Sequence, residues 1–455
     1  MQKNKILLSF SFLLTSLNPA LDFNVMIKPA VVEIKSKALS FNPGKEVCFE
    51  YSPETIFAIN VQDSDYKNLK ITKNKRSFCV TPSKNNFFIS YKSKIFPYKN
   101  VTDTSKGISN MAINNSVLVF GDKIFIKPVF SKDVNLTPII YVQFSTEALK
   151  YFVSSLEGES KKREISDVKK LMSSIMLAGD VQNDQIKIEK KKYYFSFIGN
   201  WSRENKLRIY NLYKKIVKQQ LKIYGFIPVE FMTVTFIKTK NVKLGSGFQY
   251  NNAIVYILPE SIDINDSEFL KLLVHEHFHI WNGLYFKPSE NAQEELAWFH
   301  EGVTNYYALM NLVSSGIISE KEFLNYLSKI YMKYDSSYKP ADQDTLEELR
   351  EFFIVMALDL ETMRASGLRA NLDTVLKDIS FKPSILKNGY DNKSIKYELT
   401  EIANWDVSGF FNLYIYSKKK LSMDPYFEYL GLKFSPELLL VKEKQTKAYS
   451  KWLSR

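Results

Sequence analysis

Short apolar segments separated by Pro, Gly, Asn and Asp fill the first third of the chain. Between residues 25 and 146 they show almost no helical spacing, and they include 30–34, 86–91, 116–120, 123–130 and 138–144. Apolar runs of this length, bounded by turn-forming residues, are typical of strands. The pattern predicts an N-terminal β-sandwich over residues 25–155.

The pattern changes after a polar connecting segment between about residues 156 and 192. Residues 205–224 place apolar side chains at helical spacing, and Gly225 follows as a helix-ending residue. Residues 230–237 alternate in polarity, and 253–258 form an apolar run after the turn at Asn251-Asn252. We therefore expect one helix beside a small sheet.

The remainder of the chain has helical spacing. A helix capped by Asp266 or Asn265 is followed by one over 294–316, and Ser319 with Glu322 forms a capping box for a third. Further helices are expected at 345–366, 372–379 and 407–417. The order predicts a multidomain α+β protein, with a small sheet and helices over 190–320 and a helical C-terminal region over 321–455.

The N-terminus has the layout of a targeting segment. Lys3 and Lys5 precede the apolar run 6–14, and residues 15–20 break the helix and end in a small residue. This indicates a signal peptide over 1–20 and export to a periplasmic or secreted location. Two alternatives are a buried first strand and an uncleaved segment that anchors the protein to the membrane.

Composition narrows the possible partners. The 455 residues are 45% hydrophobic and 14% aromatic, which excludes global disorder. The net charge is +13, but lysine clusters such as 161–163, 190–192 and 418–420 are short, scattered and not interleaved with aromatic residues. We interpret them as solvated faces and expect no nucleic acid partner. Contact with an anionic membrane surface is a weaker alternative.

The chain has two cysteines, Cys48 and Cys79, each beside strand-like residues. In an exported protein they could form a disulfide between two strands. Two reduced, buried cysteines are the alternative, and a catalytic role is not expected.

All four histidines lie between residues 275 and 300. His275 and His279 are one helical turn apart, so their imidazoles project from one face and can share a metal ion. Glu276 lies beside them, where it can take a proton from a water on the metal. His277 projects elsewhere and is expected to be structural or at the rim of the pocket.

A second helix supplies a carboxylate. Glu301 on this helix can lie beside the two imidazoles if the helices pack antiparallel. Two neutral histidines, one carboxylate and a water form an open tetrahedral site suited to one catalytic zinc ion. Asn305, one turn later, is either a hydrogen-bond partner of a ligand imidazole or an ordinary surface amide. His300 is expected in the pocket wall.

The segments His275-Glu-His-Phe-His-Ile-Trp-Asn-Gly and Trp298-Phe-His-Glu-Gly-Val-Thr-Asn-Tyr-Tyr resemble the glycyl aminopeptidase family of gluzincin metallopeptidases. Later segments, such as Leu358-Asp-Leu-Glu and Gly409-Phe-Phe, fit the same family. The resemblance implies a thermolysin-like catalytic domain over 190–320 and hydrolysis of a peptide or protein substrate.

Two segments depart from the family. Relatives carry a Gly-Gly-Leu-Glu-His-like segment whose glutamate gathers the free amine of the substrate, whereas this chain has Gly245-Ser-Gly-Phe-Gln-Tyr. Gly247 and Gln249 are therefore candidate substrate-binding residues, with the charge of the glutamate lost. The family's oxyanion-supporting tyrosine falls at residues 348–351, which contain none, although Tyr334 or Tyr338 could replace it.

These observations lead to two functional hypotheses. The first is a zinc peptidase in which Glu276 acts as the general base and the substrate lies along residues 253–258. The alternative is a catalytically weak or inactive zinc-binding homologue that binds peptides or proteins. The aromatic residues beside the ligands are interpreted as core packing rather than substrate stacking, and they are Trp281, Trp298, Tyr306 and Tyr307.

Overall fold

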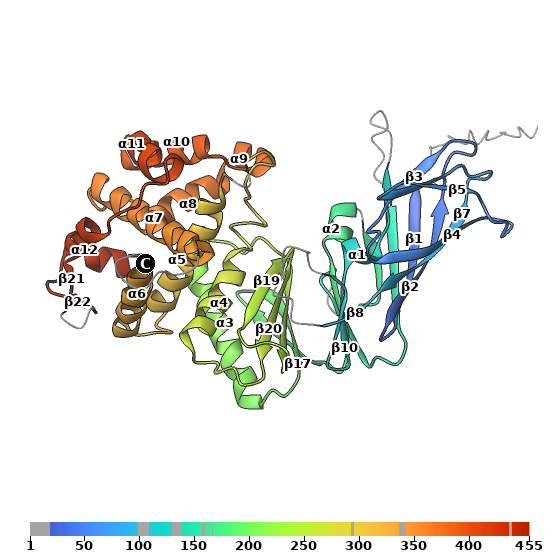
Figure 1. Ribbon diagram of the computed structural model, residues 1–455, viewed down its shortest axis with the longest axis horizontal. Helices are drawn as coiled ribbons and strands as arrows, with labels where there is room; N and C mark the ends of the chain where they lie inside the picture. Colours follow the sequence, from blue (N-terminus) through green and yellow to red (C-terminus); the bar gives the residue numbers. More distant parts are fainter. Residues whose placement is uncertain are drawn as a thin grey trace, which may run out of the picture. The chain divides into compact units, whose positions relative to one another are not determined.

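The computed structural model describes residues 19–98, 109–129, 139–156, 160–165, 167–292, 295–335, 343–435 and 439–454. They belong to two compact units, Met1–Val181 and Gln182–Arg455 (Figure 1). The boundary lies in the polar segment between the two expected domains, and the C-terminal helices share the second unit with the small sheet. The expected signal peptide lies outside the described residues except for its last two positions, and Tyr338 lies outside them altogether.

The N-terminal unit is built from three sheets. The first has the order β14-β12-β1-β2-β7-β4, the second β13-β15-β10-β9-β8 and the third β11-β3-β6-β5. The strands of the first sheet are Lys162–Ile165, Ile139–Thr146, Ala20–Ile27, Val31–Leu39, Phe87–Lys94 and Ile56–Asp63. Those of the second are Tyr151–Ser154, Ile175–Gly179, Ser116–Phe120, Met111–Ile113 and Phe96–Pro97. Those of the third are Lys127–Val129, Val47–Glu50, Ser77–Val80 and Ile71–Lys73, and the short helices α1 (Gly121–Ile124) and α2 (Val168–Met172) accompany the sheets.

The core of this unit follows the two-residue period of its strands. On β1 the side chains of Leu21, Phe23 and Val25 are buried while those between them are more exposed, because alternate residues face opposite sides of a sheet. The sulfur atoms of Cys48 and Cys79 are bonded to each other, which joins the paired strands β3 and β6. Of the two states considered for these cysteines, the structure therefore has the disulfide.

The C-terminal unit begins with a mixed sheet in the order β16-β17-β18-β20-β19. These strands span Gln182–Ile188, Lys191–Ile198, Phe231–Thr239, Ala253–Pro259 and Ser246–Tyr250. Strands β17, β18 and β20 run parallel, and the edge strand β19 pairs antiparallel with β20. The segment expected to receive the substrate, 253–258, is therefore paired on both sides. The edge on this side of the sheet belongs to β19, whose glycine, Gly247, concealed it from the apolar pattern.

Helices make up most of the remaining C-terminal unit. They are α3 (Arg203–Tyr224), α4 (Ser267–Phe278), α5 (Ala297–Ser314), α6 (Glu320–Tyr334), α7 (Gln343–Ala365), α8 (Leu372–Phe381), α9 (Pro383–Asn388), α10 (Asn392–Ala403), α11 (Ser408–Phe410), α12 (Asp424–Leu430) and α13 (Lys447–Leu453). A π-helix, η2 (Phe411–Tyr416), and a hairpin of β21 (Leu432–Phe434) with β22 (Leu440–Lys442) complete the described part. The segment 407–417, expected as one helix, is thus a short α-helix followed by a π-helix.

Local signals set several helix ends where the sequence predicts them. The carboxylate of Asp266 accepts hydrogen bonds from two backbone N–H groups at the start of α4, and Ser319 and Glu322 form the expected capping box. Helix α3 ends at Gly225, whose φ of +80° suits glycine because it has no Cβ. These ends are confirmed.

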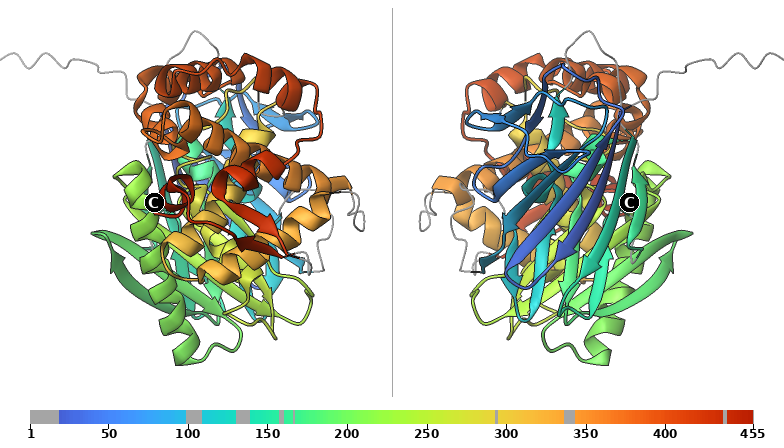
Figure 2. Two further views of the ribbon diagram at one scale, coloured as in Figure 1. Left: turned by 90° about the vertical axis from the view of Figure 1, so that its left-hand side faces the viewer. Right: turned by 90° about the vertical axis from the view of Figure 1, so that its right-hand side faces the viewer.

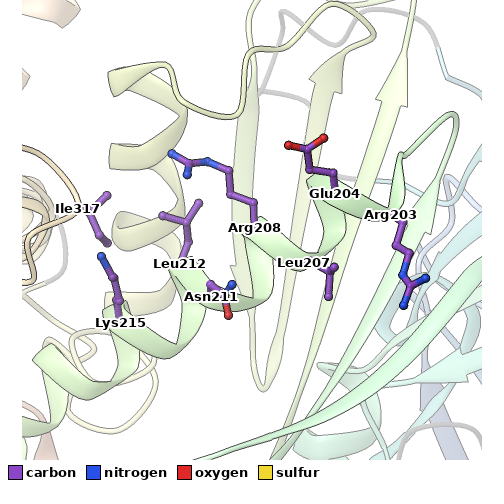
Figure 3. A pocket seen from close by; sticks show the side chains of 8 residues that line it. All are labelled: Arg203, Glu204, Leu207, Arg208, Asn211, Leu212, Lys215 and Ile317. Atoms are coloured by element: carbon purple, nitrogen blue, oxygen red, sulfur yellow. The ribbon is translucent and has the colours of Figure 1, made fainter.

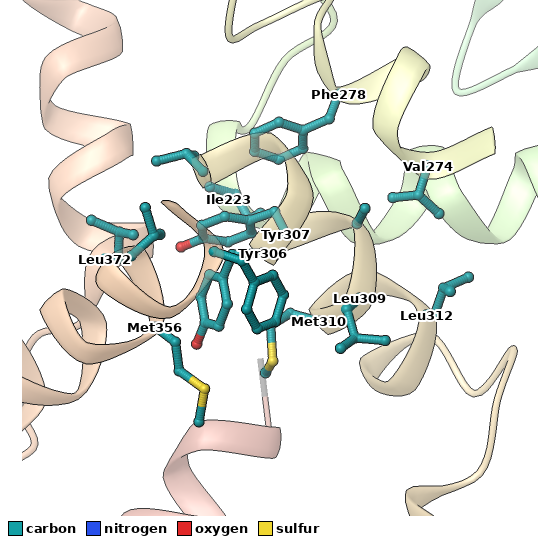
Figure 4. Packing of buried hydrophobic residues seen from close by; sticks show 14 of the residues in the cluster. Ile223, Val274, Phe278, Tyr306, Tyr307, Leu309, Met310, Leu312, Met356 and Leu372 are labelled. Atoms are coloured by element: carbon teal, nitrogen blue, oxygen red, sulfur yellow. The ribbon is translucent and has the colours of Figure 1, made fainter. Parts of the chain in front are cut away.

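The two helices that carry the candidate ligands are held by one hydrophobic core. Figure 4 shows Phe278 of α4 beside Tyr307 of α5, and their rings stack with centroids 5.2 Å apart. Trp281, Trp298 and Tyr306 are also buried, which confirms the interpretation of these aromatics as core residues. Helix α3, the long green helix in Figure 2, packs on the sheet through Tyr213, whose ring lies 5.1 Å from that of Phe195. The contact between Phe278 and Tyr307 within this core fixes α4 relative to α5.

Candidate metal centre and active site

Three side chains predicted as metal ligands converge at the C-terminal end of α4. The Nε2 atoms of His275 and His279 are 3.1 Å apart, and Oε2 of Glu301 on α5 lies 3.5 and 3.7 Å from them. Their ligand atoms all lie within 4.8 Å of one another, which is a group capable of holding a metal ion. The side-by-side packing of α4 and α5 therefore brings together residues that are separated in sequence.

Each imidazole is oriented by a hydrogen bond on its other nitrogen. His275 Nδ1 lies 3.1 Å from Oδ1 of Asn305, and His279 Nδ1 lies 3.0 Å from the carbonyl oxygen of Asn282. Both partners are acceptors, so each Nδ1 carries the proton and each Nε2 directs its lone pair toward the centre. Asn305 thus lies where the sequence predicts a partner for an imidazole.

Asn282 is a site residue that sequence reasoning missed. Its side chain donates to the carbonyl of His300 and to Oγ1 of Thr304, while Tyr390 donates to its Oδ1 over 3.2 Å. The available signal was an asparagine three residues after His279, in a segment that leaves the helix. These bonds hold the loop whose carbonyl orients His279.

Burial sets the charge state of the ligand groups. It lowers the pKa of His275 well below the ordinary value of a histidine, and the neighbouring His279 adds to the effect. A neutral imidazole is the form that binds metal. Burial also raises the pKa of Glu301, so an uncompensated negative charge is unfavourable at this position without a cation.

Glu276 lies at the cleft beside the ligands with 6% of its surface exposed. Burial, followed by the nearby Glu301, raises the pKa of its carboxyl to about 8. Strand β19 passes close to it at Gly247, where an added Cβ would lie 2.7 Å from Cγ of Glu276. Gly247 therefore leaves room for Glu276 at the edge of the sheet.

Gln249, the other candidate for substrate binding, is not among the described residues that line this cleft. Its side-chain amide donates to the backbone carbonyl of Asn251 in the turn after β19. The amide is thus directed toward the turn that follows its own strand.

The cleft has a volume of about 790 Å³ and is bordered by β19, α4, α5 and α7. Glu348 and Glu351 of α7 line it, at the segment where the family's tyrosine was expected. No tyrosine occurs among its described lining residues. Tyr334 does not reach the cleft, because its hydroxyl donates to the carbonyl of Leu421 and accepts from the N–H of the same residue.

The other two histidines have different environments. His277 is fully buried between the hydroxyl of Tyr193, at 3.1 Å, and the amide oxygen of Gln220, at 2.5 Å, and burial lowers its pKa to about 3. His300 packs beside His279, with ring centroids 4.9 Å apart, and its Nε2 lies 3.5 Å from Oε1 of Glu301. His277 is therefore a core residue, and His300 lies behind the ligands.

A second hollow, of about 670 Å³, follows the outer surface of α3 (Figure 3). It is lined by the basic side chains of Arg203, Arg208 and Lys215 and by the exposed Leu207. No histidine or cysteine lines it among the described residues, so it lacks the metal-binding chemistry of the cleft.

Part of the chain is similar to a known family. Residues 268–355, which include both ligand helices, match the M61 glycyl aminopeptidase family. The match confirms the predicted resemblance to this family over the segment that carries the three candidate ligands. No curated protein shows significant sequence similarity to it.

Solved structures share the fold. An aminopeptidase N family protein from Idiomarina loihiensis aligns with a TM-score of 0.76 at 16% identity, covering 90% of this chain and 78% of that one. The M1 zinc metallopeptidase from Deinococcus radiodurans gives 0.53 at 10% identity, covering 88% and 93%. Legionella pneumophila aminopeptidase A, in complex with aspartic acid, gives 0.54 at 10% identity, covering 87% and 49%. The predicted α+β fold class is confirmed.

Proposed function

We propose that the protein is a zinc-dependent peptidase in which His275, His279 and Glu301 hold one zinc ion and Glu276 is the general base. The observation that carries the proposal is the convergence of the two Nε2 atoms and the Glu301 carboxylate beside Glu276. Zinc held by such a set lowers the pKa of a bound water to about 7 and polarises the carbonyl under attack.

The charge and position of Glu276 suit proton transfer. Among the described residues its carboxylate has no hydrogen-bond partner, and it lies at the cleft wall between β19 and the ligands. Glu276 accepts a proton from the attacking water and then delivers it to the leaving amine. Burial raises the pKa of its carboxyl above that of an exposed glutamate, which makes its carboxylate a stronger proton acceptor.

The peptide has an available path along β19. This strand pairs with β20 on one side and is an edge of the sheet on the other. An extended peptide adds its backbone to such an edge through main-chain hydrogen bonds. Gly247 brings this edge next to Glu276, so a peptide bond bound there lies beside the general base.

The second candidate function is a peptide- or protein-binding module with weak or no catalysis. It is favoured by the absence of a tyrosine among the described residues of the cleft and by the engagement of Tyr334 with Leu421. Loss of one oxyanion donor typically costs about 100- to 1000-fold in rate.

Peptide-library cleavage by the zinc-loaded protein and its Glu276→Gln variant tests the proposal. We expect hydrolysis by the parent, loss of hydrolysis in the variant and one zinc per chain in both. A parent that carries zinc, binds peptides and cleaves none of them favours the binding module. A protein that takes up no zinc contradicts both candidates.

We also propose that the protein is exported, in accordance with the signal peptide expected at 1–20. The disulfide between Cys48 and Cys79 supports this, since disulfides persist in oxidising compartments. Among the described residues, no helix combines the length and apolarity needed to cross a membrane. Mass spectrometry of the mature N-terminus tests cleavage after the leader, and an intact leader on a membrane-bound protein indicates an anchor instead.

A further inference from the structure

The charge of the cleft is opposite to that of the chain as a whole. The protein carries a net charge of +13, yet the cleft is lined by six carboxylates and only two lysines, Lys243 and Lys271. The carboxylates belong to Asp266, Glu268, Glu276, Glu301, Glu348 and Glu351. A cleft lined mainly by one sign of charge concentrates ligands of the opposite sign.

Glu351 is the most unusual of these carboxylates. Only 6% of its surface is exposed, and it lines the cleft. It has no hydrogen bond or ion pair among the described residues. The adjacent Arg350 is engaged elsewhere, because its guanidinium donates to Glu347 over 3.1 Å and to the carbonyl of Tyr414. A buried carboxylate without a partner is unfavourable unless a ligand supplies one.

The position of Glu351 beside the metal centre follows from the packing of α5 on α7. These helices lie side by side in Figure 1. They approach closely at Gly302, the residue after Glu301, where an added Cβ would lie 2.9 Å from the backbone oxygen of Glu351. The contact places the Glu351 carboxylate on the wall that also carries Glu301.

The neighbouring charges do not neutralise this wall. Glu348, one turn before Glu351, lies exposed at the rim of the same cleft. Lys271 lies one turn before His275, and its ammonium is 6.0 Å from the ring centroid of Tyr326. No ion pair within 4.0 Å joins Lys271 to either glutamate among the described residues. Lys271 is attracted electrostatically to Glu348. Glu351 has no direct partner among the described residues.

The spacing favours an organic cation over a second metal ion. Among the described residues, neither Glu348 nor Glu351 belongs to a group of three ligand atoms within 4.8 Å of one another. A divalent ion requires such a compact group, whereas an ammonium or guanidinium group can reach separated acceptors with its several N–H donors.

We propose that Glu351, assisted by Glu348, forms a subsite on α7 for a cationic nitrogen group of the substrate. The group is either the α-ammonium of the peptide or the charged side chain of a lysine or arginine residue. This rests on the proposed peptidase function, for which it defines the substrate class. It gives α7 a role in recognition at the segment where relatives carry a tyrosine.

Binding measurements on a catalytically silenced protein test the subsite independently of turnover. The zinc-loaded Glu276→Gln protein is titrated calorimetrically with three probes: L-norleucine amide, L-lysine amide and Nα-acetyl-L-lysine amide. The same titrations follow in the Glu351→Gln and Glu348→Gln backgrounds. Glu347→Gln is the matched control, because it removes the same charge from the same helix but pairs with Arg350 and Lys418 instead of lining the cleft.

The expected result is a loss of about tenfold or more in affinity on Glu351→Gln, with a smaller loss on Glu348→Gln. Glu347→Gln leaves the affinity within about twofold. A loss for norleucine amide identifies the α-ammonium as the ligand, whereas a loss for Nα-acetyl-L-lysine amide identifies the side chain. Equal affinities in the parent and Glu351→Gln, or equal losses in Glu351→Gln and Glu347→Gln, overturn the proposal.

This outcome is separable from the proposed function. If probe binding depends on Glu351 but the protein with Glu276 intact cleaves no peptide, the subsite proposal stands and the peptidase proposal is rejected. If the protein with Glu276 intact cleaves peptides but probe binding does not depend on Glu351, the peptidase proposal stands and the subsite proposal is rejected. Circular dichroism of each variant confirms folding, and Glu351→Gln removes no hydrogen bond of the described structure.

Discussion

The candidate ligand imidazoles on α4 and the carboxylate of Glu351 on α7 differ in their hydrogen bonding. On the side of α4 and α5, His275 and His279 are each held by an acceptor, from Asn305 and from the Asn282 loop. On the side of α7, Glu351 is buried without a partner among the described residues. A satisfied hydrogen-bond shell fixes the geometry of a site before its ligand arrives. An unsatisfied carboxylate leaves part of its interaction energy for the ligand.

The largest expected effect concerns the proposed general base. Glu276→Gln keeps the shape of the side chain but cannot accept a proton from water. We expect kcat to fall by about 100- to 10,000-fold, with zinc content unchanged because Glu276 is not a proposed ligand. Kinetics on the best library peptide, together with metal analysis, measure both. Undiminished turnover would show that another group is the base.

The next prediction tests the hydrogen bond that orients His275. Asn305→Ala removes the acceptor on Nδ1 of His275, so the tautomer and orientation of that imidazole are no longer fixed. We expect zinc affinity to fall by about 10- to 100-fold, measured by competition with a chelator. Asn412→Ala, at an exposed position, is the control and leaves zinc affinity unchanged. Equal affinities in the two variants contradict the proposed role of Asn305.

A third prediction concerns the approach of β19 to the general base. Gly247→Ala places a Cβ 2.7 Å from Cγ of Glu276, so one of them must move. Overpacking of this kind costs about 1–3 kcal/mol, and we expect kcat/KM to fall about tenfold with zinc retained. Gly409→Ala is the matched control, because its Cβ would meet no atom within 4 Å. Unchanged kinetics in Gly247→Ala would separate β19 from the positioning of Glu276.

The smallest effect is on stability and tests the buried carboxyl group of Glu351. Burial, with the nearby Glu347 and Glu301, raises the pKa of Glu351 from 4.5 to about 7. Since the folded pKa is the higher one, the contribution of Glu351 to stability is fully present below pH 4.5 and is lost as pH rises through 7. Glu351→Gln removes this loss.

The metal-free Glu351→Gln variant is therefore expected to be more stable than wild type by on the order of 1 kcal/mol above pH 7. The difference should shrink as pH falls toward 4.5. Urea unfolding of both proteins at several pH values measures it. A constant difference across this range would indicate that Glu351 does not titrate between the two states.

The convergence of the candidate metal ligands was predictable because its signal is local. His275 and His279 are one turn apart on a helix whose start is set by Asp266, so their common face follows from helical geometry. A second helix then supplied Glu301, and two antiparallel helices suffice to bring it close. The core roles of Trp281 and Tyr307 followed from the same helical spacing.

Other parts of the site depend on contacts between distant segments. The free sheet edge was expected at 253–258, but the glycine-containing strand β19 covers β20 and becomes the edge itself. Tyr334 was a candidate to replace the missing tyrosine, yet it bonds to Leu421. Neither outcome has a signature in the nearby sequence, because strand order and side-chain partners are decided by pairing across the fold.

The sequence by itself predicted the fold class, the three side chains that converge at the cleft and several helix ends, since each rests on side-chain chemistry repeated at short, regular spacing. Tertiary structure alone decided which carboxylates of α7 face the cleft, which are buried without a partner and which carbonyl orients His279. Burial and hydrogen-bond partnership are properties of packed neighbours. Burial raises the free energy of an unpaired charge only after the chain has folded around it.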